Sequence, residues 1–223
     1  MTQIPPPKAG MWTYLINGFC KNTERNKEIV NLAIKQAELG KHIVIGTDRV
    51  NHANLLAEMI TKQGVRAEAF HSKSKRAEVL KGAVSGKVKV VVAMRSMLTG
   101  INVPIWDTYF NILPIANPPS YYQQFSIIRT VIPTKKEAVI FDFVDESGVS
   151  KGAFYKRKKQ YDAEGFVTSR YLYLRQSPLE KSDLEHKENV SFWEKRRDTM
   201  RTNIKPFFVI PKKDGKELVS LFD

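Results

Sequence analysis

The chain has 223 residues, of which 42% are hydrophobic and 26% are charged. This composition and length allow a sizeable core in one large or two small domains, and they exclude an intrinsically disordered chain. The formal net charge of +13 at pH 7 indicates an anionic partner, most commonly a nucleic acid. A basic protein without a polyanionic partner is the plainer alternative.

Membrane, secretory and metal-binding classes find no support in the sequence. No apolar run approaches the roughly 20 residues that span a bilayer, and MTQIPPPKAG at the N-terminus lacks the pattern of a signal peptide. The single cysteine, Cys20, excludes an internal disulfide framework and fits a reducing compartment. The four histidines and this cysteine show no metal-ligand spacing. We therefore expect a cytoplasmic protein with no membrane partner and no metal of its own.

The predicted elements begin with an arm over residues 1–22, where three consecutive prolines precede an aromatic and apolar patch that suits a linker or a docking segment. Short apolar runs then alternate with helical patterns as far as residue 146. The predicted helices cover 22–40, 49–64, 73–86 and 120–130. The predicted strands cover 42–47, 65–72, 87–94, 106–113 and 137–145.

Strands joined by helical crossovers run parallel, and the crossovers place helices on both faces of the sheet. The pattern therefore predicts an α/β domain with a doubly wound parallel sheet. Ligands of such sheets bind at the carboxyl ends of the strands. The polar loops that follow the predicted strands are TDRVNH, HSKSKR, RSMLTGIN and IANPPS. They predict one functional edge.

The sequence changes character after Asp145. Residues 151–166 have the pattern of a basic helix with three aromatic anchors, and KRKK at 156–159 is either a solvated face or a nucleic-acid contact. We expect a strand at 168–176, one or two helices within 177–201, and a final hairpin that turns at 214–215. The aromatic anchors of the basic helix are Phe154, Tyr155 and Tyr161.

Several known phosphate-binding patterns are missing. The sequence contains no G-x-x-x-x-G-K-[ST] loop, no G-x-G-x-x-G fingerprint, and no strand that ends in paired acids for magnesium. These absences argue against a third reading of the chain, a nucleotide- or cofactor-binding α/β enzyme of another kind.

Four segments follow one another in the chain: HIVIGTDRVNHANLLAEMI, FHSKSKR, VVVAMRSMLTGINVP and ANPPSYYQQFSIIRT. In this order they resemble the second RecA-like lobe of superfamily 2 DNA helicases and translocases, most closely their phage and viral branch. The resemblance covers residues 10–165 and is typical of a RecA-like domain at 23–165, with an inter-lobe arm before it and a basic accessory extension at 166–223.

The resemblance implies a motor that works with partners. It implies binding of DNA (or RNA), with ATP and Mg²⁺ shared with a Walker-bearing lobe that belongs to the same polypeptide or to a separate one. It also suggests a role in DNA repair or recombination, in the cytoplasm of a bacterial host if the chain is phage-encoded. Because the Walker motifs are absent, we expect no ATP hydrolysis by this chain alone and no cofactor bound by it alone.

The resemblance also implies roles for individual residues. The positions that would contact nucleic acid are Thr47, Asp48, Arg49, His71, Ser72, Lys73, Arg95 and Thr99. Gly100 and Asn102 match the G-x-[D/N] of the fifth motif and would also face the nucleotide. Gln123 opens the sixth motif, and Arg129 is the cation nearest to its arginine positions, so these two are the catalytic candidates.

The sixth motif departs from the family pattern Q-x-x-G-R-x-x-R. Counted from Gln123, Ser126 stands at the glycine position and Ile127 and Thr130 stand at the arginine positions. Those arginines reach the γ-phosphate held by the first lobe, and such a contact is worth about 10³–10⁵ in rate. Either Arg129 replaces them or ATP turnover is impaired.

Plainer interpretations stay open for each segment. Thr47 or Asp48 could cap the next helix, His71 could be an ordinary surface histidine, Gly100 could serve a plain turn, and Arg129 could pair with an acid. For the whole chain, a motor lobe is the first hypothesis. The second is a degenerate RecA-like module that binds nucleic acid, or scaffolds a helicase, without turnover.

Overall fold

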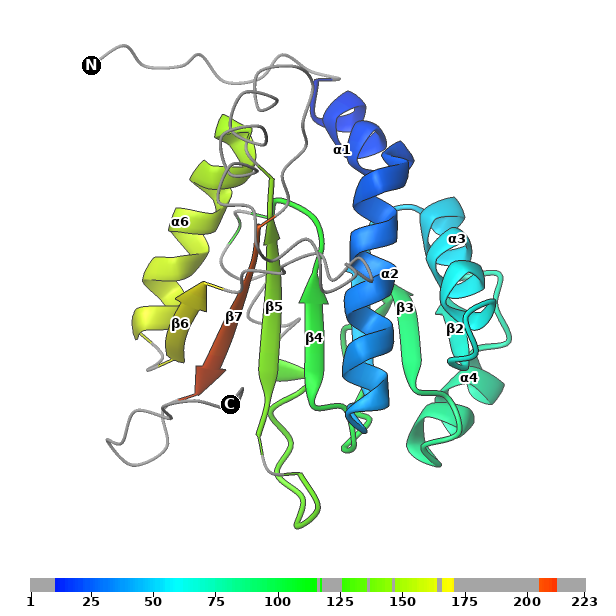
Figure 1. Ribbon diagram of the computed structural model, residues 1–223. Coiled ribbons are helices and arrows are strands. Elements are labelled where there is room, and N and C mark those ends of the chain that lie inside the picture. Colours follow the sequence, from blue (N-terminus) through cyan, green and yellow to red (C-terminus); the bar gives the residue numbers. More distant parts are fainter. Residues whose placement is uncertain are drawn as a thin grey trace, which may run out of the picture.

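The computed structural model describes residues 11–115, 117, 126–135, 137–145, 147–163, 166–170 and 205–211. In this part of the chain, one sheet has the strand order β2-β3-β1-β4-β5-β7-β6 (Figure 1). The strands are β1 Ile43–Thr47, β2 Ala67–Phe70, β3 Val90–Met94, β4 Thr108–Asn111, β5 Val139–Val144, β6 Phe166–Arg170 and β7 Lys205–Pro211. The first five are parallel, and β7 pairs antiparallel with both β5 and β6.

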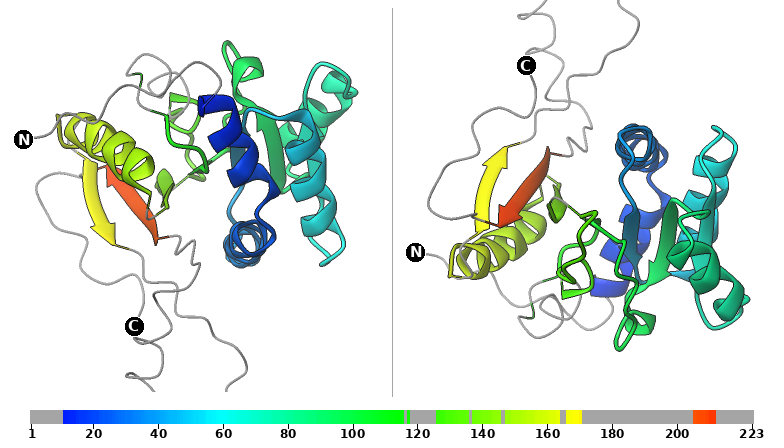
Figure 2. Two further views of the ribbon diagram at one scale, coloured as in Figure 1. Left: turned by 90° about the horizontal axis from the view of Figure 1, so that it is seen from above. Right: turned by 90° about the horizontal axis from the view of Figure 1, so that it is seen from below.

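Helices cover both faces of this sheet. They are α1 Met11–Lys21, α2 Thr23–Glu38, α3 Val50–Thr61, α4 Arg76–Val84 and α6 Gly148–Ala163, with a 3-10 turn, η1, at Arg95–Met97. The first three pack on one face, and α4 and α6 pack on the other (Figure 2). None of the described helices is both long and apolar enough to cross a bilayer.

The central strands β1 and β3 are almost wholly apolar because both of their faces are buried. In β1, Ile43 and Ile45 point into the core under α1, α2 and α3, while Val44 points into the core under α4 and α6. In β3, Val92 and Ala93 divide in the same way. The predicted doubly wound α/β fold is therefore confirmed.

The predicted elements of the first 145 residues correspond closely to observed ones. The five predicted strands correspond to β1–β5, and the helices predicted at 22–40, 49–64 and 73–86 correspond to α2, α3 and α4. Gly40 and Gly64 follow α2 and α3 with φ angles of 83° and 90°, in the left-handed region that ends helices. The helix predicted at 120–130 lies mostly outside the described residues, and so does the turn at 214–215.

Residues 11–21 differ from the predicted arm, because they form α1. Ile16, Phe19 and Cys20 recur at helical spacing and are buried, whereas Trp12 and Tyr14 are exposed. The helix begins only after the three prolines that suggested an extended arm. The division of the chain into domains stays a prediction, and the structure adds that β6 and β7 extend the same sheet beyond β5.

Candidate nucleic-acid and nucleotide interface

The predicted nucleic-acid residues lie in or just before the loops that follow β1, β2 and β3. Since these strands are parallel, the loops leave the sheet at one edge, its carboxyl edge. Helix α1 lies over this edge, at the top of Figure 1. The topology therefore brings the candidate residues together, and the side-chain contacts decide which of them face outward.

Asp48 and Arg95 join two of these loops. Arg95 Nε donates to Asp48 Oδ1 at 2.6 Å, and Arg95 Nη2 contacts Asp48 Oδ2. Both side chains are largely buried, and the two-point geometry fixes the orientation of the guanidinium. The ion pair connects η1 to the end of β1, so it stabilises the loops of the carboxyl edge.

Thr47 points into the protein. Its side chain is fully buried and its Oγ1 lies 2.9 Å from His52 Nδ1, while His52 Nε2 lies 2.9 Å from Asn26 Oδ1. Asn26 Nδ2 donates to the Cys20 carbonyl, so Asn26 Oδ1 is an acceptor and His52 carries its proton on Nε2. Burial, aided by the charge of Arg25, lowers the pKa of His52 to about 4. The histidine is neutral and holds Thr47, α2 and α3 together.

Arg49 lies beside a groove between α1 and the start of α3. Its Nε donates to Asn17 Oδ1 of α1 at 2.9 Å, and its Nη1 donates to the Asp48 carbonyl. The groove has a volume of about 580 Å³ and is lined by Asn17, Cys20, Lys21, Arg49, Val50, Asn51, His52 and Leu55. Burial raises the pKa of the Cys20 thiol. We call this the α1–α3 groove.

Helix α3 begins without a side-chain cap. Its N-cap residue, Arg49, makes no capping hydrogen bond, Thr47 is bonded to His52, and Asp48 is bonded to Arg95. The simple capping interpretation of Thr47 and Asp48 is therefore wrong. The first N–H groups of an uncapped helix favour an anionic acceptor.

His71 organises the loop after β2. It is buried, its Nε2 lies 2.9 Å from Asn54 Oδ1, and its Nδ1 accepts from the Lys73 N–H at 3.1 Å. It is therefore not an ordinary surface histidine. Its contacts hold a tight turn, which presents Ser72 and Lys73 to solvent.

The fifth-motif loop meets the segment that carries Arg129. Thr99, Gly100 and Asn102 are exposed, and Gly100 has a φ of 77° with open space where a side chain would begin. Thr130 Oγ1 donates to Asn102 Oδ1 at 3.0 Å, which places Arg129, the exposed neighbour of Thr130, next to this loop. Three of the four residues predicted on the nucleotide side therefore lie on two segments in contact.

The segment that carries Arg129 is firmly anchored. Ile127 and Ile128 are buried in the core under α4 and α6. Lys135 Nζ donates to the carbonyls of Ile128, Trp106 and Pro104 at 2.8, 3.0 and 3.2 Å, and burial lowers the pKa of this lysine. Ile127, at the first arginine position of the motif, is a core residue. Gln123 lies outside the described residues.

Two buried ion pairs lie beneath the carboxyl edge, and sequence reasoning missed both. Arg25 Nε donates to Asp145 Oδ1 at 2.9 Å, and Arg157 Nε donates to Asp142 Oδ2 at 2.7 Å. Both arginines are fully buried. A signal for them existed in the run FDFVD, because acids within a buried strand require cationic partners.

The resemblance implies a nucleotide beside this loop, so the described residues can be compared with what a nucleotide requires. Among the described residues, no group of three or more His, Cys, Asp or Glu is placed to hold a metal ion. Three exposed groups here suit phosphate oxygens. They are the main chain of Gly100, which has no side chain to cover it, the side-chain amide of Asn102 and the guanidinium of Arg129. This donor set fits the phosphates of ATP rather than its Mg²⁺.

The family of the α/β segment follows from a direct match. Residues 24–126 match the family model described as Helicase conserved C-terminal domain. This segment is therefore similar to helicase C-terminal domains. The match includes β1 to β4 and ends at Ser126, so it contains every candidate residue except Arg129. The match supports the resemblance to a helicase C-terminal lobe.

Solved structures share the fold at low identity. S. cerevisiae Dbp5 bound to RNA and ADP BeF3 is 20% identical with a TM-score of 0.51, over 63% of this chain and 37% of that one. The C-terminal domain of the DEAD-box protein Dbp5 is 17% identical with a TM-score of 0.52, over 65% of this chain and 82% of that one. T4 UvsW is 16% identical with a TM-score of 0.54, over 70% of this chain and 36% of that one. These likenesses show the RecA-like fold alone.

The chain covers little more than a third of the Dbp5 chain and of UvsW, at 37% and 36% of their lengths. The separate C-terminal domain of Dbp5 is covered to 82%. No curated protein matches the chain. The chain therefore spans only part of the length of these larger proteins.

Proposed function

We propose that the chain is the C-terminal motor lobe of an ATP-dependent DNA helicase or translocase. It would bind the nucleic-acid backbone and complete the ATP site of a Walker-bearing lobe, in the same polypeptide or a separate one. The hydrogen bond between Thr130 and Asn102 carries this proposal. It joins the segment of Arg129 to the loop of Gly100, as a lobe that closes over a shared nucleotide requires.

The carboxyl edge supports the nucleic-acid side of the proposal. Ser72, Lys73 and Thr99 are exposed there, and the uncapped start of α3 lies beside Arg49 and Lys21 in the α1–α3 groove. Exposed cations, hydroxyls and helix N-termini are the groups that contact phosphates. The backbone of one strand could therefore follow this edge without base recognition. ATP would supply the energy for movement along it.

A second candidate function is a binding module without turnover. Its support is Ile127, which is only 4% exposed and belongs to the core, so the first arginine position of the sixth motif offers no guanidinium. In this case Arg129 would not serve as a catalytic cation, and nucleic-acid binding would be independent of ATP in any mixture.

The test is the ATPase activity of the chain mixed with a Walker-bearing lobe, with and without DNA or RNA. We expect activity only in the mixture, stimulated by DNA. Arg129→Ala should lower the rate by about 10³-fold because it removes a cation from the transferring phosphate, with nucleic-acid affinity unchanged. Arg66→Ala, which removes an exposed arginine at the start of β2, is the matched control.

The outcomes separate the two candidates. Full activity in Arg129→Ala would exclude this residue as the catalytic cation. No activity in any mixture, with salt-sensitive DNA binding intact, would favour the binding module. Stimulation by RNA but not by DNA would correct the nucleic acid while keeping the motor.

A further inference from the structure

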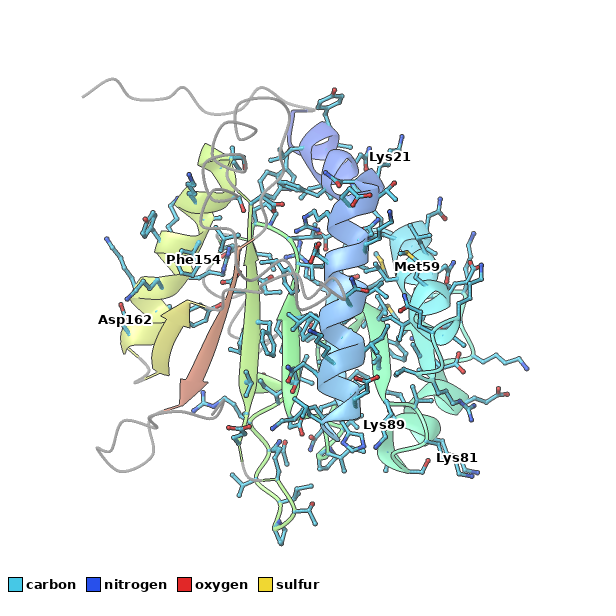
Figure 3. All side chains as sticks on the ribbon, in the orientation of Figure 1. Lys21, Met59, Lys81, Lys89, Phe154 and Asp162 are labelled. Atoms are coloured by element: carbon cyan, nitrogen blue, oxygen red, sulfur yellow. The ribbon has the colours of Figure 1, made fainter. Side chains whose placement is uncertain are left out.

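Helix α6 has two faces of different chemistry. Its buried side chains recur every three or four residues and pack toward β5 and β6. They are Ser150, Ala153, Phe154, Arg157 and Tyr161. Figure 3 shows Phe154 along this helix and Asp162 near its C-terminal end. The opposite face of α6 is exposed, and none of the contacts described above for the carboxyl edge involves it.

The exposed face carries a regular stripe. Lys151, Tyr155 and Lys159 follow one another at intervals of four residues, so they stand in one row on the helix with a rise of about 6 Å between neighbours. Tyr155 is 63% exposed, which is unusual for so large a ring. The ring of the buried Phe154 lies 5.8 Å from it, centroid to centroid, and so supports it from the side of the core.

The charge of this face is unbalanced. Its acid, Asp162, is already bonded to Lys158 at 2.7 and 2.9 Å. Lys151, Lys156 and Lys159 form no ion pair with any described residue. Three unpaired cations around an exposed aromatic ring form a surface complementary to a polyanion with exposed rings of its own. Single-stranded nucleic acid has both features, since its bases are unpaired and every base has a face for stacking.

The position of the stripe fits the same ligand. Helix α6 begins three residues after Asp145, at the carboxyl end of β5, so Lys151 lies in its first turns, next to the edge proposed to carry the backbone. From there the helix runs back along the sheet (Figure 1). A strand leaving the carboxyl edge can therefore continue along α6.

We propose that the Lys151–Tyr155–Lys159 stripe of α6 is a second binding surface, specific for single-stranded nucleic acid. Tyr155 stacks on a base, and the lysines contact the phosphates on either side of it. This inference rests on the proposed nucleic-acid function and adds a surface outside the loops of the carboxyl edge.

The experiment measures binding of the full chain to a fluorescent oligothymidine and to a blunt duplex by anisotropy. Tyr155→Ala should weaken oligothymidine binding by about tenfold, and Tyr155→Phe should keep it, because phenylalanine still stacks. The double substitution Lys151→Ala and Lys159→Ala should also weaken it. Alanine is favourable at exposed helical positions, so these variants should fold, and circular dichroism checks this.

Two control variants match the substitutions. Tyr14→Ala removes a tyrosine on α1 that is even more exposed than Tyr155, and Lys81→Ala removes an exposed lysine on α4, at the other end of the sheet from α6 (Figure 3). Both should bind like the unchanged chain. An affinity loss in Lys81→Ala as large as that of the double lysine variant would overturn the stripe as a specific site.

Three further outcomes would overturn the inference. These are an unchanged affinity in Tyr155→Ala, an equal loss in Tyr155→Phe, or an equal loss for the duplex, whose bases cannot stack on the ring. If Lys73→Ala weakens binding and Tyr155→Ala does not, the inference fails while the edge remains. If the unchanged chain binds no oligonucleotide, the proposed function fails as well.

Discussion

His52 is a buried histidine that must stay neutral for the edge to keep its shape. Its pKa is lowered to about 4 by burial and by Arg25, whereas the unfolded chain returns it to about 6.5. Because the unfolded state binds the proton more tightly, the contribution of His52 to stability is complete above pH 6.5. It is lost progressively as the pH falls from there toward 4.

We therefore expect the free energy of unfolding to fall by about 2 kcal/mol between pH 7 and pH 5 through this one residue. Urea unfolding at a series of pH values measures the fall. His52→Gln should be less stable at pH 7, because it disturbs the bonds to Thr47 and Asn26, but its stability should depend less on pH. Parallel pH curves for the variant and the unchanged chain would contradict this account.

The contact between α6 and β5 depends on the buried pair of Arg157 and Asp142. Asp142 also accepts from Asn111 Nδ2 and from the Tyr161 hydroxyl, so one carboxylate joins β4, β5 and α6. Arg157→Leu would leave this carboxylate buried without a cation. We expect a loss of about 3–5 kcal/mol in the free energy of unfolding, measured by urea denaturation.

A second substitution separates the charge from the packing. Asp142→Asn combined with Arg157→Leu should cost less than the sum of the two single changes, because the groups touch and the double variant buries no unpaired charge. Lys156→Ala, one residue away but exposed, should change stability by less than about 0.5 kcal/mol. Additive losses in the double variant would show that the pair contributes mainly by packing.

The elements show what a single sequence can predict. The central strands were predictable because a strand that is buried on both faces needs a continuous apolar run, such as IVI within HIVIGT. Helix α1 was missed because its 11 residues follow three prolines, and because the core that its buried side chains join is completed by residues far along the chain, as far as Phe143. Arg157 could not be separated from the other residues of KRKK by composition. Its burial follows from the helical phase set by Ala153, Phe154 and Tyr161.

The site was predictable in place but not in detail. Topology alone put the loops at one edge, since parallel strands end together. The directions of the side chains depend on partners brought in by folding, such as His52 for Thr47 and Asp48 for Arg95. Arg95 lies 47 residues from Asp48, a separation that no local pattern encodes. His52 lies only 5 residues from Thr47, but its other ring nitrogen is bonded to Asn26, 26 residues away.

For the whole molecule, the formal net charge of +13 overstates what is free to meet a partner. Arg25, Arg95 and Arg157 are committed to buried or largely buried aspartates. Among the exposed lysines that remain are Lys73 at the carboxyl edge and Lys151, Lys156 and Lys159 on the exposed face of α6. These four, rather than the total charge, should set the salt dependence of binding.

If each of these lysines neutralises one phosphate of a single strand, the logarithm of the binding constant should fall with the logarithm of salt concentration with a slope of about −3. Replacing Lys73, Lys151 and Lys159 by alanine should bring the slope close to −1, because three released counterions are lost. Titrations of oligothymidine binding between low and physiological salt measure both slopes. An unchanged slope in the triple variant would mean that the diffuse field of the whole molecule, and not these contacts, attracts the strand. Lys62→Ala, which removes an exposed lysine bonded to Glu58 on α3, should leave the slope as it is.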